Sequence, residues 1–146
     1  MKFTTEVLLV DDNPADSDLV SEILRRNKCP SNIHSVSDGI EAIAYLRQQG
    51  KYSTDLAPDL VLLDLNLPGK DGHAVLTEVK SDPKLRAIPI VIFSTSQAKK
   101  DIVCSYQLGA NSYVTKPGNL PDFISAVTTI GEFWFCCALL APKEER

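Results

Sequence analysis

The sequence lacks the long apolar run that a membrane-spanning helix requires. No part of its 146 residues contains roughly 18 consecutive apolar side chains. The opening residues, 1–6, also lack the apolar centre of a secretory signal peptide. These two absences argue against an integral membrane protein and a secreted one. We therefore expect a cytoplasmic location and no membrane partner.

Basic clusters are scarce as well. The chain has 15 Lys and Arg against 19 Asp and Glu, which gives a formal net charge of −4. A nucleic-acid-binding domain carries a basic patch, and the sequence has no long basic run, so nucleic acid is not expected as a main partner. The overall composition, 44% hydrophobic and 23% charged, is typical of one globular domain with a core.

Cysteine pairs with the spacing of a metal site are missing. The four cysteines, Cys29, Cys104, Cys136 and Cys137, form no CxxC pair, and neither histidine is near them in the sequence. A zinc site would need a cluster that this spacing does not indicate. We therefore expect four free thiols in a reducing compartment.

What the sequence does contain is an alternation of apolar runs and amphipathic segments. We expect strands at residues 7–10, 32–36, 60–65, 89–93 and 112–115. Helices are expected to begin near residues 14, 39, 72, 99 and 121. The second helix should end at Gly50 with Ile40, Ile43 and Leu46 inward, and residues 51–58 should form a surface loop. This alternation predicts an α/β domain with a parallel sheet covered by helices on both faces.

One stretch organises the rest of the chain. Residues 60–63 form a continuous apolar run, which suits a strand buried on both faces, and Asp64 follows it directly. Other expected strands also end in polar residues: Asp11 and Asp12 after the first, Ser94 after the fourth, and Lys116 after the fifth. Because the carboxyl ends of parallel strands meet at one edge, these side chains should converge in the crevice where such sheets bind ligands.

Three carboxylates in one crevice repel each other, and a hard divalent cation such as Mg²⁺, or Mn²⁺ in its place, removes that repulsion. Asp12 and Asp64 could bind the cation directly and Asp11 through water, and the backbone carbonyl of Asn66 could add a ligand. A cation does not account for Lys116 or Ser94, whereas a phosphoryl group does. Asp64 is then the expected nucleophile, because carboxylates form aspartyl phosphates.

This combination resembles the receiver domain of bacterial response regulators over roughly residues 6–130. Four motifs carry the resemblance: the pair Asp11-Asp12, the stretch from Asp64 to Leu67-Pro68-Gly69, Ser94, and Tyr113-Val114-Thr115-Lys116-Pro117. The separations, 30 residues from Asp64 to Ser94 and 22 from Ser94 to Lys116, are the family's usual ones. The resemblance implies a flavodoxin-like fold with strand order 2-1-3-4-5. It also implies a cation held by Asp11, Asp12 and the Asn66 carbonyl, and a Lys116-Pro117 peptide bond that is commonly cis.

The resemblance further implies a signalling protein rather than a turnover enzyme. A sensor histidine kinase would transfer a phosphoryl group from its phosphohistidine to Asp64, which would draw in Ser94 and turn Tyr113 inward. The face formed by the fourth helix, the fifth strand and the fifth helix would change in consequence. Thr95 stands where the family usually has Ala or Gly, and we expect it to crowd Tyr113. Asn66 and Ser96 flank the expected phosphate and should tune its hydrolysis.

Within the family, the chain is most similar to the single-domain response regulators of cyanobacterial and bacterial phytochromes. Three sequence features carry this similarity: the loop at 51–58, the segment Phe93-Ser94-Thr95-Ser96, and the tail Glu132-Phe133-Trp134 with Leu139-Leu140. We therefore expect a phytochrome-like kinase as partner, a receiver domain at 1–131, a tail at 132–146, and no DNA-binding domain. The apolar tail residues would either form a homodimer or partner surface, or fold back on the core. They are Phe133, Trp134 and Phe135.

Three other readings fit less well. A haloacid-dehalogenase-like phosphatase would need a second Asp two residues after the nucleophile, where this chain has Asn66, and a cap domain. A flavin- or nucleotide-binding module would need a glycine-rich loop after the first strand, where this chain is acidic. A pseudo-receiver that only binds partners would not require the acidic residues together with Lys116.

Overall fold

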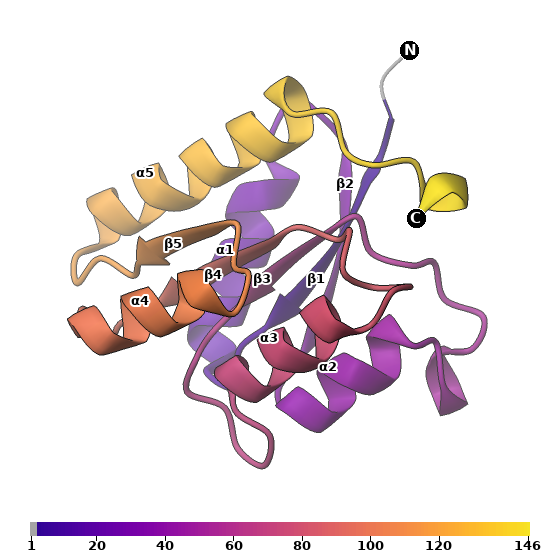
Figure 1. The fold of residues 1–146 in the computed structure, drawn as a ribbon. Coiled ribbons are helices and arrows are strands. Elements are labelled where there is room, and N and C mark those ends of the chain that lie inside the picture. The colour runs from indigo at the N-terminus through magenta and orange to yellow at the C-terminus, as the bar shows by residue number, and fades with distance from the viewer. Residues whose placement is uncertain (1–2) are drawn as a thin grey trace.

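The computed structural model describes residues 3–146, which form one five-stranded parallel sheet with the order β2-β1-β3-β4-β5 (Figure 1). The strands are β1 (Thr5–Val10), β2 (Ser31–Val36), β3 (Leu60–Leu63), β4 (Ile90–Ser94) and β5 (Ser112–Thr115). The helices are α1 (Pro14–Arg25), α2 (Gly39–Leu46), α3 (Gly72–Ser81), α4 (Lys99–Gln107) and α5 (Leu120–Gly131). The predicted fold class and strand order are confirmed.

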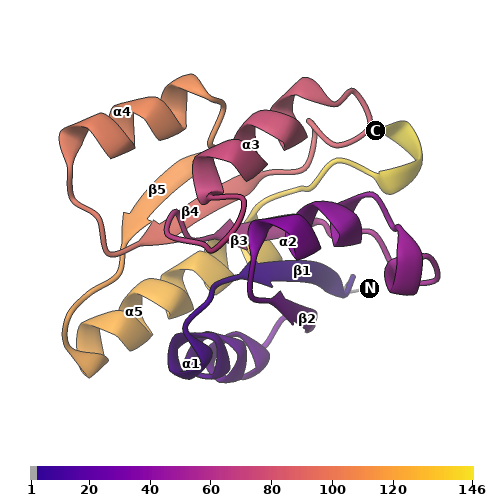
Figure 2. The same cartoon turned by 90° about the horizontal axis from the view of Figure 1, so that it is seen from below.

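The helices form two layers around the sheet. Helices α1 and α5 cover one face, and α2, α3 and α4 cover the other (Figure 2). Alternate residues of β3 serve both sides, since Val61 and Leu63 belong to one core cluster and Leu60 and Leu62 to the other. This two-sided burial explains why the strand reads as an unbroken apolar run.

Side-chain caps fix the starts of four helices. Asn13, Asp38, Asp71 and Asn119 each accept a hydrogen bond from a backbone N–H in the first turn of the helix that follows. Pro14 occupies the first turn of α1, where its missing N–H costs nothing. These caps lie in the loops that follow β1, β2, β3 and β5, so they also set where each helix leaves the carboxyl edge of the sheet.

The second helix and the loop after it differ from expectation. Helix α2 ends at Leu46 rather than Gly50, and a short 3₁₀ helix, η1 (Gly50–Tyr52), follows. Ile43 and Leu46 are buried as predicted, but Ile40 is 62% exposed, because it lies on the outer side of the first turn. The loop at 51–58 is not wholly superficial. Tyr52 is buried, edge-on to the ring of Tyr45.

Two further expectations about the backbone are wrong. Strand β3 ends at Leu63, two residues early, because the chain turns after Asp64 and the Leu65 carbonyl accepts a hydrogen bond from Gly72 at the start of α3. The described residues contain no cis peptide bond, so Lys116-Pro117 is trans.

No helix in the described part of the chain is both long enough and apolar enough to span a membrane.

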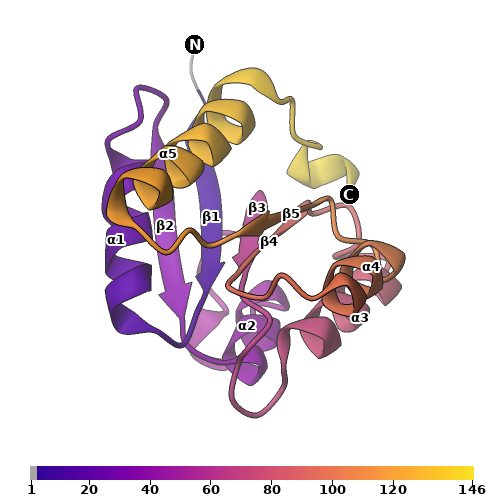
Figure 3. The ribbon, with the colours of Figure 1, turned by 90° about the vertical axis from the view of Figure 1, so that its left-hand side faces the viewer.

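The chain contains two further short helices after α5. A π-helix, η2 (Glu132–Cys137), continues the axis of α5, and a 3₁₀ helix, η3 (Lys143–Glu145), lies near the amino ends of the strands (Figures 1 and 3). Trp134 and Phe135 pack against the core cluster under α1 and α5, whereas Phe133 is 52% exposed. The Arg146 guanidinium donates to the Asp59 carboxylate at 3.0 Å.

The expectation of four free thiols is also wrong. Cys29 and Cys136, 107 residues apart, form a disulfide, whereas Cys104 and Cys137 are free. The pairing arises because the π-helix carries Cys136 back alongside the turn after α1, where Cys29 lies. The sequence spacing gave no sign of it, since neither cysteine has a partner nearby in the chain.

Candidate functional site

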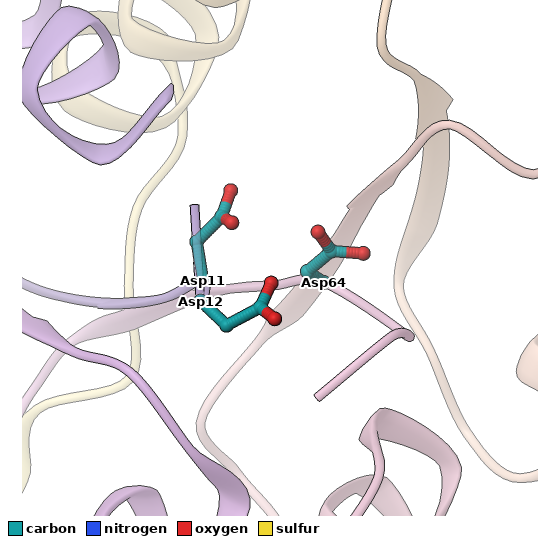
Figure 4. Close-up of side chains that lie close together, drawn as sticks. All are labelled: Asp11, Asp12 and Asp64. Atoms are coloured by element: carbon teal, nitrogen blue, oxygen red, sulfur yellow. The ribbon is translucent and has the colours of Figure 1, made fainter. Parts of the chain in front are cut away.

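The three predicted carboxylates meet at the carboxyl edge of the sheet. Asp11 and Asp12 follow β1, Asp64 follows the neighbouring β3, and Figure 4 shows the three side chains close together. Each offers an oxygen atom, and these oxygens all lie within 4.8 Å of one another. Asp11 and Asp64 are buried, and Asp12 is exposed. Such a set of oxygen donors is typical of a divalent metal site.

Backbone contacts fix the two buried carboxylates. The Asp64 N–H donates to the Val10 carbonyl at 2.9 Å, which holds the end of β3 against β1. One Asp11 oxygen accepts from the Asn13 N–H at 2.9 Å, and one Asp64 oxygen accepts from the Asn66 N–H at 3.2 Å. Backbone hydrogen bonds therefore hold both buried carboxylates in place.

Gly72 allows α3 to begin against this strand end. Its N–H donates to the Leu65 carbonyl at 3.0 Å. A Cβ atom at position 72 would overlap the Asp64 carbonyl oxygen and come within 2.6 Å of the Leu65 Cα. A larger residue would thus push apart the two segments that place Asp64.

Lys116 brings a buried positive charge to the carboxylates. It follows β5, and its side chain is only 4% exposed. Its ammonium donates to Asp11 at 2.7 Å and to Asp64 at 3.0 Å. The expected convergence of the strand-one, strand-three and strand-five ends is thus observed as direct contact, across 105 residues of sequence in the case of Asp11.

Asp16 is a fourth carboxylate that the sequence reasoning missed. It lies in the first turn of α1 and accepts a hydrogen bond from the Lys116 ammonium at 2.9 Å. The sequence contained an indication of this residue, namely an acid in the first turn of a helix that begins beside Asp11 and Asp12. Side chains in a helix tilt toward its N-terminus. A first-turn acid there points back toward the strand end.

The charges in the site influence one another. Burial raises the pKa of the Asp11 carboxyl above its usual range, although hydrogen bonds from Lys116 and Asn13 act in the opposite direction. Burial alone lowers the pKa of Lys116, but its hydrogen bonds to Asp11, Asp16 and Asp64 outweigh burial, so its pKa lies above the usual range. The lysine is therefore a fixed cation in a site with more negative than positive groups.

The predicted switch residues lie around the end of β4. Ser94 is fully buried, and its hydroxyl accepts from the Ser96 N–H at 3.4 Å. The hydroxyl of Ser96 donates to Asp101 of α4 at 2.6 Å. Tyr113 is partly buried and donates from its hydroxyl to the Ser96 carbonyl at 2.8 Å. Thr95 is exposed.

The side chain of Asn66 is exposed beside an open depression of about 490 Å³. Asp12, Asp71 and Asp101 also line this depression. The depression lies next to the three carboxylates, because Asp12 lines the depression and is also one of the three. A small anion or the side chain of a partner protein can therefore reach the acidic residues from solvent.

Comparison with known proteins agrees with this geometry. The family model described as the response regulator receiver domain matches residues 7–128. Response regulator Rcp1 of Synechocystis sp. is 45% identical over 128 residues, which cover 88% of this chain and 87% of Rcp1.

Solved structures give the same result. The phosphorylated cyanobacterial phytochrome response regulator RcpA has 48% sequence identity and a TM-score of 0.93, with 96% of this chain and 100% of that chain covered. The Mn²⁺-bound form of Rcp1 has 43% identity and a TM-score of 0.91, with 94% and 99% covered. The chain described here is therefore a member of the response regulator receiver domain family, a signalling protein related to the phytochrome response regulators.

Proposed function

We propose that this receiver accepts a phosphoryl group on Asp64 from the phosphohistidine of a sensor histidine kinase. The observation that supports this most strongly is the Lys116 ammonium, buried and hydrogen-bonded to Asp64 at the end of the central strand. A lysine in this place neutralises charge that arrives with a phosphoryl group. RcpA, which this chain resembles, was solved in a phosphorylated form.

A divalent cation, Mg²⁺ or Mn²⁺, fits the oxygen donors of Asp11, Asp12 and Asp64. The Asn66 backbone carbonyl is proposed as a further ligand. When bound, the cation would offset the negative charge shared by the carboxylates and the phosphoryl oxygens. Rcp1, a relative, was solved in a Mn²⁺-bound form.

The reaction itself requires positioning more than covalent help from other residues. An Asp64 carboxylate oxygen attacks the phosphorus, a P–O bond forms, and the P–N bond to the kinase histidine breaks. The departing imidazole nitrogen keeps the electron pair of that bond and takes a proton from water. Lys116 neutralises the equatorial phosphoryl oxygens, and the Ser94 hydroxyl is proposed to donate to one of them.

The proposed output begins at Ser94 and Tyr113. Ser94 now bonds to the Ser96 N–H, and Tyr113 bonds to the Ser96 carbonyl, so a phosphoryl group that draws Ser94 away would change both contacts. Their common partner, Ser96, also donates to Asp101 at the start of α4. The α4–β5–α5 face would therefore respond through this loop. Asn66, Ser96 and Thr95 remain proposed as residues that tune phosphate lifetime or the movement of Tyr113.

The kinase partner is proposed to be of the phytochrome type, because the cyanobacterial phytochrome response regulator RcpA matches 96% of this chain. A cytoplasmic location and an unidentified downstream protein are part of the same proposal. The tail at 132–146 is proposed as an appendage to a receiver at 1–131. Its contact residue for a homodimer or partner would be Phe133, since Trp134 and Phe135 pack on the core.

Incubation with Mg²⁺ and acetyl phosphate tests the reaction without a kinase. Wild type should gain a single phosphoryl adduct that is acid-stable and base-labile, and Asp64→Asn should gain none. Asp18→Asn removes the same charge from an exposed position on α1 and should behave as wild type. An unmodified wild type, or an adduct that persists in Asp64→Asn, would overturn the proposal.

The partner and the tail are tested separately. A phosphorylated phytochrome-type kinase should transfer its phosphoryl group faster than a kinase of another sensor class, and equal rates would remove the phytochrome assignment. For the tail, Phe133→Ala should lower the fraction of dimer measured by light scattering. A mass distribution unchanged from wild type would remove the tail contact.

A further inference from the structure

We propose that Asp16 is a positioning residue for Lys116, which it holds in place while Asp11 and Asp64 turn to the cation and the phosphoryl group. The proposal rests on the proposed function and deepens it. It starts from one observation, namely that the Lys116 ammonium is shared among three carboxylates from three different segments.

The hydrogen bonds of Lys116 are fully used in this structure. An ammonium has three N–H donors. They reach Asp11 at 2.7 Å, Asp16 at 2.9 Å and Asp64 at 3.0 Å. A phosphoryl oxygen can therefore bond to Lys116 only if one of these three carboxylates gives up its contact.

The reaction weakens two of the three contacts. Asp11 and Asp64 belong to the group whose oxygens could share a cation, whereas Asp16 is outside that group among the described residues. Phosphorylation also turns one Asp64 oxygen into the ester oxygen of an acyl phosphate. Asp16 is the partner that neither event recruits, so it can keep Lys116 aligned throughout.

Helix α1 gives Asp16 a fixed position. The Asp16 N–H donates to the Asn13 side chain at 3.1 Å, which ties it to the residue that caps the helix. A carboxylate in the first turn is also favoured by the helix dipole. The helix is anchored by Val20 and Leu24, both buried in the core. Asp16 therefore has a rigid support independent of β1 and β3.

Because Asp16 is partly exposed, its charge repels an incoming phosphoryl group only weakly. Its side chain is 28% exposed, against 2% for Asp11 and 9% for Asp64. Water screens a charge in that position better than it screens the two buried carboxylates. Asp16 can thus orient the lysine while repelling an incoming phosphoryl group less than a buried carboxylate would.

The test is the rate of phosphorylation by acetyl phosphate with saturating Mg²⁺, measured over a range of acetyl phosphate concentrations. In this reaction the P–O bond to the acetyl group breaks, acetate leaves, and Asp64 gains the phosphoryl group. Asp16→Ala should lower the maximal rate on the order of tenfold, because misplacing a reacting group slows catalysis more than it weakens binding. Asp16→Asn, which keeps an acceptor oxygen without the charge, should fall between Asp16→Ala and wild type.

Asp18→Asn is the matched control, since it removes an exposed carboxylate from the same helix. It should keep the wild-type rate. The concentration of acetyl phosphate at half-maximal rate should be unchanged in all variants. A second readout is the NMR signal of the Lys116 ammonium, identified by its loss in Lys116→Met. It should shift in Asp16→Ala and stay in place in Asp18→Asn, whether or not phosphorylation occurs.

The outcomes separate this proposal from the proposed function. An Asp16→Ala variant that is phosphorylated as fast as wild type, or faster because a repelling charge is gone, would overturn the role of Asp16 alone. An unmoved ammonium signal would do the same. A wild type that takes no phosphoryl group would overturn the proposed function, and with it the reaction that Asp16 serves.

Discussion

Helices α1 and α4 both begin at the carboxyl edge of the sheet, yet they are held in different ways. Helix α1 has a side-chain cap at Asn13, a proline in its first turn, and four buried residues. Helix α4 follows Ala98, which has no capping side chain, and Ser105 is its buried residue. Apolar burial therefore fixes α1 far more firmly than α4.

Polar contacts take the place of a core under α4. The Ser105 hydroxyl donates to the Asp101 carbonyl at 2.7 Å and lies 3.0 Å from a ring nitrogen of His73 on α3. Val103 and Tyr106 of the same helix are about half exposed. Elements with little buried apolar surface open and shift most readily. The molecule therefore has a rigid side around α1, which positions the charges, and a loosely held side around α4, which is suited to movement.

The largest expected effect comes from the charge that the rigid side positions. Lys116→Met leaves buried Asp11 and Asp64 without their cation, which should lower stability by about 3–5 kcal/mol in the absence of Mg²⁺. The phosphorylation rate should fall on the order of 100-fold or more. Urea unfolding with and without Mg²⁺ measures the first effect, and a stability equal to wild type would show that the pair is not buried as described.

The next test compares the same substitution on the two helices. Val20 is fully buried under α1, so Val20→Ala should lower the free energy of unfolding by about 2 kcal/mol. Val103 is 52% exposed on α4, so Val103→Ala should change it by less than about 0.5 kcal/mol. Equal losses of unfolding free energy, measured in urea, would show that α1 is not held more firmly than α4.

Removing the cap of α1 should lower stability, whereas adding a cap to α4 should raise it. Asn13→Ala removes the cap of α1 and should cost about 1 kcal/mol. Ala98→Asn adds a capping side chain at an extended residue before α4 and should stabilise that helix by up to about 1 kcal/mol. Hydrogen exchange of the α4 amides measures the second effect, and no added protection there would show that the cap is not what α4 lacks.

The smallest expected effect is a pH dependence of the Mg²⁺-free protein. Burial raises the pKa of the Asp11 carboxyl above its usual range, so the folded state binds this proton more tightly than the unfolded state does. This group's contribution to stability is therefore present below about pH 4 and is lost as the pH rises through the raised pKa. Asp11→Asn should remove that slope from urea unfolding measured across this range, whereas an unchanged slope would assign it to another group.

Much of the rigid side could be predicted from the sequence. The apolar run before Asp64 suited a strand buried on both faces, and a parallel sheet then brings the ends of β1, β3 and β5 to one edge. Asp16 was missed because a first-turn acid has an ordinary explanation in the helix dipole. Its second partner, Lys116, lies 100 residues away in the chain.

The remaining differences depend on packing that spacing alone does not determine. Ile40 was predicted to point inward, but the buried side of α2 carries Gly39, Ala42, Ile43 and Leu46, which leaves Ile40 on the outer side of the first turn. The Cys29–Cys136 pair depends on the path of the π-helix, which has no periodic signal. Tyr52 sits in a polar loop, and its burial comes from the neighbouring rings of His34 and Tyr45.

Asp64 is expected to be the only residue that accepts the phosphoryl group. Borohydride reduction after incubation with Mg²⁺ and acetyl phosphate, followed by peptide mapping, marks the aspartate that carried an acyl phosphate. A mark is expected at Asp64 alone in wild type and Asp18→Asn, and a weaker mark at the same residue in Asp16→Ala. A mark at Asp11 or Asp12, or no mark at any aspartate, would contradict it.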